Sequence, residues 1–171
     1  MAASIEDRLR QVEDYEAIRQ LKAFYAKCAD SKYTDDHRRK PQPEIDAITR
    51  HQVDAVFTDD AIWDGGQQFG EIEGRNAIYD HLRAGRWSFS MHYFLNPHIE
   101  LDGDSAHATW MLWQPCTLED GDRSMLMSAT TEDDYVRMPT GWRLQRYRFV
   151  LKFLTPHDEP WSKARGVPFK R

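Results

Sequence analysis

The sequence is poor in cysteine and has no long apolar segment, and both absences exclude classes of protein. Only two cysteines, Cys28 and Cys116, occur among 171 residues, and they are too few for a disulfide framework or a zinc signature. No apolar run approaches the ~20 residues of a membrane-spanning helix. The first residues also lack the apolar core of a secretion signal. These features predict a cytoplasmic protein that does not enter the membrane.

Excess positive charge and the common cofactor motifs are also missing. Lys and Arg number 23 against 28 Asp and Glu, so the net charge is −5, and a mildly acidic chain lacks the basic surface typical of nucleic-acid binding. The sequence contains no glycine-rich nucleotide loop, no nucleophile elbow and no HExxH. None of the seven histidines lies two or four positions from another. We therefore expect no nucleic-acid partner, no metal and no cofactor.

Hydrophobic periodicity predicts an α+β protein. Apolar residues recur every three or four positions over 5–30 and again over 44–57, which is typical of amphipathic helices, and 74–83 reads as a third, short helix. From residue 99 onward, runs of β-forming residues alternate with Gly- and Asp-rich turns. They predict three long antiparallel strands at 105–117, 123–138 and 142–154. Helices followed by such a meander indicate a curved sheet with helices on one face. We expect a single domain over 1–171, with its core at 10–156 and a C-terminal arm at 157–171.

The last predicted strand has two different faces. Tyr147, Phe149, Leu151 and Phe153 alternate with a cationic set, which comprises Arg146, Arg148 and Lys152. Because side chains alternate across a strand, the aromatic set is expected to face a core or pocket. The cationic set is then expected to face water or another subunit.

Three residues suggest a catalytic site without forming a local motif. Asp30 ends the first predicted helix, where a carboxylate opposes the helix dipole, and Tyr25 lies on the buried side of that helix. His92 lies within an apolar strand, and a buried imidazole needs a partner that fixes its tautomer. Asp30 and His92 are therefore candidates for an acid–base dyad. The alternative is a core histidine bonded to the backbone, with Asp30 as an ordinary loop cap.

Four segments, 15–30, 60–74, 90–97 and 141–156, resemble in their order the SnoaL-like branch of the NTF2-like (cystatin-like) superfamily. Within it they are most similar to the lyases, namely bile-acid 7α-dehydratase, hexachlorocyclohexane dehydrochlorinase and scytalone dehydratase. The resemblance implies a cone-shaped, strongly curved β-sheet wrapped around three α-helices. It also implies a homo-oligomer, with a trimer favoured and a dimer as the alternative.

The resemblance implies roles for particular residues. His92 and Asp30 fall on the Asp–His dyad of the family lyases, and Tyr25 falls on the tyrosine of the bile-acid enzyme. The implied activity is a cofactor-independent β-elimination, most simply a dehydration, of a small hydrophobic substrate that is steroid-like, polycyclic or aromatic. The substrate-binding residues expected around the dyad are Trp63, Trp87, Tyr93, Asn96, Tyr147, Phe149 and Phe153.

This sequence departs from the family at two pocket positions, and other activities remain open. Leu151 stands where the bile-acid dehydratase carries an arginine, and Tyr147 stands nearest to a pocket-lining cation of the dehydrochlorinase. The substrate of neither enzyme can therefore be assigned to this chain. An isomerase would use Asp30 as base, with Tyr25 stabilising the oxyanion, and a polyketide-type cyclase would use the same residues. A non-catalytic module that binds a ligand or assembles with a partner is also compatible with the fold.

Overall fold

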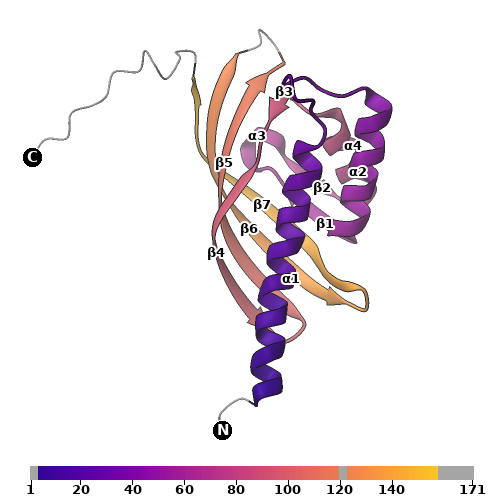
Figure 1. Cartoon of the computed structure of the whole chain (residues 1–171), viewed down its shortest axis with the longest axis vertical. Helices are drawn as coiled ribbons and strands as arrows, with labels where there is room; N and C mark the ends of the chain where they lie inside the picture. Colours follow the sequence, from indigo (N-terminus) through magenta and orange to yellow (C-terminus); the bar gives the residue numbers. More distant parts are fainter. Residues whose placement is uncertain (1–3, 120–122, 158–171) are drawn as a thin grey trace, which may run out of the picture.

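The computed structural model describes residues 4–119 and 123–157, and it alternates helix and strand before ending in a long meander. The helices are α1 (Ile5–Asp30), α2 (Gln42–Val56), α3 (Gly66–Phe69) and α4 (Arg75–Ala84). The strands are β1 (Phe57–Asp64), β2 (Glu71–Glu73), β3 (Trp87–Ser90), β4 (Tyr93–Asp102), β5 (Ser105–Leu118), β6 (Ser124–Met138) and β7 (Gly141–Pro156) (Figure 1). Residues 158–171 of the predicted arm lie outside the described residues.

The strands form one curled sheet with the helices on its concave side. The strand order is β2-β1-β7-β6-β5-β3, and β4 pairs with β5 as well. The parallel pairing is between β1 and β7, and the other pairs are antiparallel. Figure 1 shows α1 running along the open side of the curl, with α2 and α4 beside it. The predicted α+β fold, a curved sheet around three main helices, is confirmed. The one-turn helix α3 was not among the predicted helices.

Helix α1 begins with a complete capping box and ends at Asp30. The Asp7 backbone N–H donates to Ser4 Oγ at 3.0 Å, and the Ser4 N–H donates to Asp7 Oδ2 at 3.1 Å, so aspartate serves where glutamate is usual. The first turns project beyond the sheet (Figure 1). Their apolar residues Ile5, Leu9 and Val12 are consequently exposed, although the sequence pattern predicted that this whole face would be buried.

Two β-bulges in β7 decide which of its side chains face inward. Asp134 of β6 pairs with Arg146 and Tyr135 pairs with Leu144, so Gln145 is an extra residue. Ser128 pairs with Phe153 and Ala129 with Leu151, so Lys152 is a second extra residue. Each extra residue shifts the alternation by one position. Tyr147 and Phe149 are therefore buried, whereas Phe153 is exposed on the outer face, which corrects the prediction that it would join the inner set.

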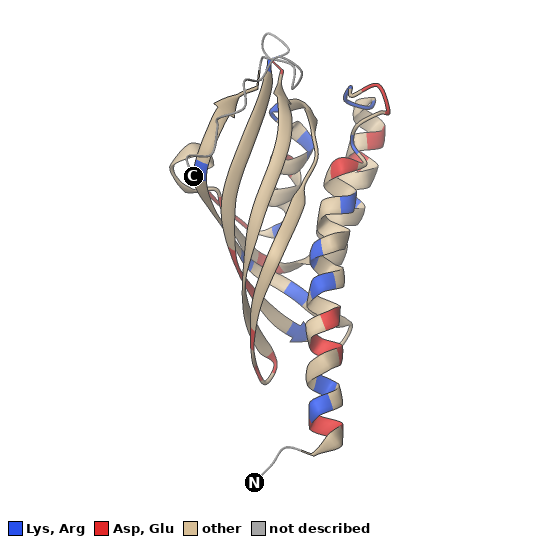
Figure 2. Ribbon diagram, turned by 60° about the vertical axis from the view of Figure 1, so that its left-hand side comes forward, with Lys and Arg blue, Asp and Glu red and all other residues tan. Residues whose placement is uncertain are grey.

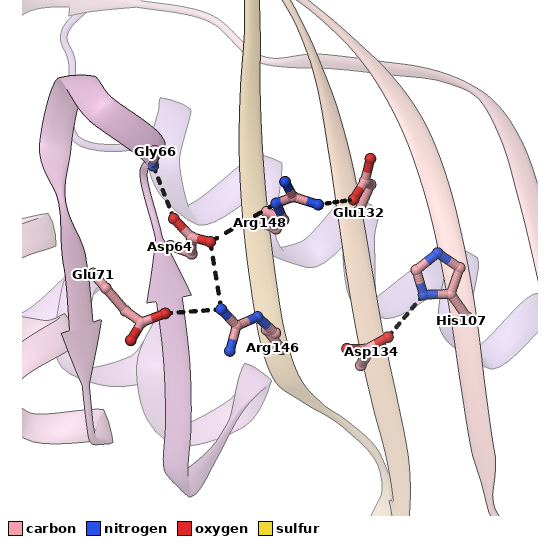
Figure 3. Close-up of polar contacts among 8 residues, drawn as sticks. All are labelled: Asp64, Gly66, Glu71, His107, Glu132, Asp134, Arg146 and Arg148. Carbon is pink, nitrogen blue, oxygen red and sulfur yellow. Dashed lines mark hydrogen bonds and ion pairs between the residues drawn. The ribbon is translucent and has the colours of Figure 1, made fainter.

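The outer face of β7 is balanced in charge rather than cationic. Arg146 contacts Glu71 at 2.8 Å and Asp64 at 3.4 Å, and Arg148 contacts Glu132 at 2.8 Å (Figure 3). These pairs connect β2, β1, β7 and β6 across the sheet. Because each arginine has a carboxylate partner, the predicted cationic face is neutralised within the chain. It gives no support to a subunit contact based on charge.

The inner faces of β5, β6 and β7 meet α1, α2 and α4 in a single hydrophobic core. Its fully buried members include Ile18, Val53, Ile78, Leu112 and Leu144. Both cysteines are free and buried. Among the described helices, none is long and apolar enough to cross a membrane.

Candidate active site

Asp30 and His92 lie in direct contact at the open end of the curl. Asp30 is the last residue of α1, and His92 lies in the two-residue link between β3 and β4. His92 Nδ1 is 2.8 Å from Asp30 Oδ1, and the His92 backbone N–H donates to Asp30 Oδ1 at 3.0 Å and less closely to Oδ2 at 3.3 Å. The carboxylate thus fixes both the ring and the backbone of His92. This partner accounts for a carboxylate at the unfavourable end of a helix dipole.

The contact leaves one ring nitrogen of His92 available. An ionised carboxylate accepts hydrogen bonds, so Nδ1 must carry the hydrogen and Nε2 presents its lone pair. No residue of the described chain forms a hydrogen bond with Nε2, and the side chain is 16% exposed. An imidazole oriented by a carboxylate, with its second nitrogen free, has the arrangement of a general base.

His92 lies on the wall of a cavity of about 250 Å³ enclosed by the sheet and the helices. The cavity is mainly apolar, and its aromatic lining residues are Tyr25, Tyr33, Trp63, Phe69, Trp87, Tyr147 and Phe149. Leu112 of β5 and Met127 of β6 complete the wall on the sheet side. An apolar chamber with a few polar groups is typical of sites for small organic ligands.

Three aromatic rings form a stack along one side of this cavity. The Tyr147 ring lies between Tyr25, at 5.8 Å between centroids, and Trp63, at 5.6 Å with the planes 6° apart. Burial is the main cause that raises the pKa of the Tyr25 hydroxyl above its usual value, so this group stays protonated. A buried phenol that keeps its proton has an O–H available as a hydrogen-bond donor.

Four of the seven predicted substrate-binding residues line the cavity and three do not. Trp63, Trp87, Tyr147 and Phe149 line it. Tyr93 and Phe153 lie on the outer face of the sheet and are exposed. Tyr93 follows His92 directly, so its side chain points the opposite way along the strand.

Asn96, the third of these predicted substrate-binding residues, also lies outside the cavity lining. It adopts a positive φ of 48° at a bulge in β4, and its amide contacts Met111 Sδ on the outer face. Asparagine tolerates this conformation better than most residues, and Pro97 follows it. The Asn-Pro break seen in the sequence therefore coincides with the bulge in β4.

The cavity also contains polar residues that the sequence did not single out. Lys32, His81, Ser90 and Gln114 line it. The Ser90 hydroxyl donates to Tyr33 OH at 3.3 Å. Burial, followed by the charges of Arg86 and Lys32, lowers the pKa of His81. Lys32 lies two positions after Asp30, outside the predicted helices and strands, and no sequence pattern predicted its burial.

A buried ion pair lies beside the aromatic stack. Lys22 Nζ of α1 is 2.6 Å from Asp133 Oδ2 of β6, and the side chains are 2% and 0% exposed. Lys22 also donates to Thr131 Oγ1 at 3.1 Å, and Tyr135 OH donates to Asp133 Oδ2 at 2.8 Å. The Lys22 ammonium lies 4.7 Å from the centroid of the Tyr147 ring. The pair thus supports the ring at the centre of the stack.

Metal binding finds no support in the described residues. Among them, no three His, Cys, Asp or Glu side chains lie close enough together to hold a metal ion.

Comparison with known sequences identifies related proteins along most of the chain. Residues 44–148 match the SnoaL-like domain family. An uncharacterized protein of Mycobacterium tuberculosis, Rv2910c, is 29% identical over 152 residues, which cover 84% of each chain.

Solved structures share the fold at low sequence identity. A type 2 hexachlorocyclohexane dehydrochlorinase (LinA) superposes with a TM-score of 0.73 at 17% identity, covering 96% of this chain and 97% of that one. A protein provisionally assigned as scytalone dehydratase from Novosphingobium aromaticivorans has a TM-score of 0.70 at 14% identity and covers 91% and 97%.

A third solved structure identifies the fold class. An NTF2-like protein with a cystatin-like fold, also from N. aromaticivorans, has a TM-score of 0.64 at 21% identity and covers 89% and 92%. The fold predicted from the sequence is therefore confirmed as NTF2-like. Because the family match extends from the first turn of α2 to the middle of β7 and covers more than half of the chain, the chain belongs to the SnoaL-like domain family.

Proposed function

We propose that this protein is a cofactor-independent lyase that catalyses a β-elimination, most simply a dehydration, of a small hydrophobic substrate. The observation that carries the proposal is the Asp30–His92 contact at the wall of an apolar cavity. Lyases are among the structural neighbours, because the dehydrochlorinase shares the fold over nearly its full length. The likeness concerns the fold, so the chemistry is argued from the residues of this chain.

In the proposed reaction, His92 Nε2 removes a proton from a carbon next to a carbonyl or a conjugated system. The electron pair of that C–H bond forms the new double bond, and the C–O bond on the neighbouring carbon breaks. The leaving hydroxide takes the proton from the imidazolium of His92, so water is released and the base is regenerated. Asp30 accepts the Nδ1–H hydrogen bond and stabilises the imidazolium as it forms. Tyr25 donates a hydrogen bond to the leaving hydroxyl or to the developing enolate.

The cavity size narrows the substrate class. Ligand pockets commonly measure ~300–1,000 Å³, and this cavity of about 250 Å³ lies just below that range. A group of one or two rings fits such a space better than a four-ring steroid. The flat stack of Tyr25, Tyr147 and Trp63 also suits an aromatic or conjugated ring.

The geometry argues against an isomerase that uses Asp30 as its base. Both oxygens of Asp30 accept from the His92 backbone, and Oδ1 also faces Nδ1. The cavity is lined by His92 and not by Asp30. A proton on a bound ligand is therefore presented to the imidazole.

Product mass tests the proposed reaction directly. The protein is incubated with a panel of β-hydroxy ketones bearing one or two aromatic rings, and we expect at least one to lose one water, as seen by mass spectrometry. An isomerase would give a product with a different chromatographic retention time but the same mass as the substrate, and this outcome would overturn the proposed elimination. A ligand that binds and is recovered unchanged across the panel would favour a non-catalytic module.

We also propose that the chain forms a homo-oligomer, with a trimer favoured by the family resemblance. Two exposed apolar regions support it. One is the outer patch of the sheet, defined as Tyr93, Leu95, Met111, Trp113 and Phe153, and the other is the exposed strip of α1 with Ile5, Leu9 and Val12. Charged residues of both signs are spread along α1, whereas parts of the long strands carry none (Figure 2). Exposed apolar patches of this kind are typical of interaction sites.

Light scattering of charged variants tests the oligomer. Trp113→Glu places a charge in the outer patch, and Leu9→Glu places one on α1. We expect Trp113→Glu to shift the protein to monomers, because a charge buried at an interface is costly. A wild-type protein that is monomeric would remove the proposal, and dissociation by Leu9→Glu alone would assign the contact to α1.

A further inference from the structure

The cavity lining carries positive charge that the proposed reaction does not use. Lys32, from the loop after α1, and Arg86, just beyond α4, both line the cavity. No Asp or Glu is among the lining residues. The negative charge of Asp30 is engaged by His92. Both cations help to lower the pKa of His81, after burial, and His81 also lines the cavity. A ligand near His81 therefore meets two cations without a carboxylate to neutralise them.

Lys32 is buried without an ion-pair partner in the described chain. Lys32 is only 8% exposed, and its Nζ donates a hydrogen bond to the Leu82 carbonyl at 3.1 Å. Desolvation is the main cause that lowers the pKa of Lys32 to about 8, with Arg39 adding to the effect and Cys28 opposing it. An ammonium has three N–H donors, so Leu82 leaves two of them free. Burying a charge without a counter-ion is unfavourable.

Capping of α4 accounts for only one of the three N–H donors of Lys32. Arg39 already donates to the carbonyls of Ala84, at 2.6 Å, and Arg83, at 3.1 Å. These are the last two carbonyls of the helix, and the half-buried Arg39 satisfies them. Lys32 satisfies the Leu82 carbonyl with one N–H, and its other two N–H groups serve no carbonyl of the helix end.

Arg86 supplies a planar fork at the exposed side of the cavity. Its guanidinium lies 5.1 Å from the centroid of the Phe69 ring, and no ion pair to it is formed within the described residues. A guanidinium that stacks on an aromatic ring keeps its N–H edges free to bind a carboxylate through two parallel hydrogen bonds. Phe69 is itself a lining residue, so the fork is positioned over the cavity.

We propose that Lys32 and Arg86 form a carboxylate-binding subsite, so that the ligand of this cavity is an aromatic or conjugated acid. The carboxylate lies between the two cations, and the ring lies against the Tyr147 stack. This inference deepens the proposed function by naming the substrate class, and it rests on that function only for the step at His92. The binding itself depends on Lys32 and Arg86 alone.

A matched pair of ligands tests the subsite by binding. Calorimetry compares 2-naphthoate with 2-naphthamide, which have the same ring and differ in charge. We expect the wild-type protein to bind the naphthoate about 10- to 100-fold more tightly, as follows from hydrogen bonds to charged groups. Lys32→Met and Arg86→Met are each expected to remove most of this preference, whereas Lys32→Arg retains it.

The controls separate this subsite from general charge and from catalysis. Arg50→Met removes another arginine that stacks on an aromatic ring, at 3.8 Å from the Tyr79 centroid but outside the cavity lining, and the preference is expected to persist. His92→Ala is also expected to keep it. Equal affinity of the wild-type protein for naphthoate and naphthamide would overturn the subsite. So would a preference for naphthoate that persists in each of the folded variants Lys32→Met and Arg86→Met. A preference without any elimination would overturn the proposed reaction and leave the subsite standing.

Discussion

His92→Ala is expected to lower kcat/KM by ~10²–10⁴-fold for the substrate that loses water, because this is the usual contribution of a positioned general base. Asp30→Asn should cause a loss of similar size, because the two residues act as one unit and their effects do not add. An asparagine amide can present its N–H₂ to Nδ1, which would then move the ring hydrogen to Nε2. The base would be present but blocked.

Thermal unfolding and the rate of a Tyr25 variant distinguish a loss of catalysis from a loss of folded protein. Thermal unfolding should show that His92→Ala remains folded, since the His92 backbone N–H that donates to Asp30 is retained in alanine. Tyr25→Phe removes one hydrogen-bond donor and keeps the dyad, so we expect a smaller loss of rate. Wild-type turnover in either dyad variant would remove Asp30 and His92 from the mechanism and leave their contact a structural one.

The sequence predicts the fold well because the long periodic segments follow local rules. The apolar spacing over 5–30 predicted α1, and three β-rich runs between turns predicted β5, β6 and β7. The errors arise where one residue changes the register. The extra residue Lys152 turns Phe153 to the outer face, and a bulge has no distinct signal in a run of alternating residues.

The candidate site was predicted where a residue was unusual in its local setting. Asp30 opposes a helix dipole and His92 interrupts an apolar strand, so each required a partner. Lys32 offered no such signal, because a lysine in a polar loop is ordinary. Its burial follows from the approach of α4, whose Leu82 carbonyl it contacts, and that packing between distant segments is not encoded in local periodicity.

Lys22 and Asp133 did carry a signal that went unused. Lys22 lies four positions after Ile18 and three before Tyr25, on the buried stripe of α1, and Asp133 lies between Thr131 and Tyr135 on the inner face of β6. Each charge breaks the apolar pattern of its own element. Two opposite charges that break two buried patterns indicate a pair, although one sequence alone does not show that they meet.

Breaking this pair should have the largest effect on stability. Lys22→Met leaves Asp133 buried with Tyr135 as its remaining hydrogen-bond partner, and Asp133 Oδ1 already lacks one. Asp133→Asn leaves the Lys22 ammonium buried without a counter-ion. We expect each change to lower the free energy of unfolding by ~3–5 kcal/mol, as for other buried pairs that lose one partner. Urea unfolding at pH 7 measures it.

The double variant and a surface control decide whether the loss comes from the uncompensated charge. Lys22→Met combined with Asp133→Asn removes both charges and keeps an acceptor for Tyr135, so it should be more stable than the sum of the single losses predicts, with a coupling of ~1–3 kcal/mol. Lys27→Met changes an exposed lysine of the same helix and should stay within ~0.5 kcal/mol of wild type. Additive losses would show that the two charges do not stabilise each other. Because Lys22 lies against Tyr147, destabilisation is expected to be accompanied by weaker binding of aromatic ligands in the cavity.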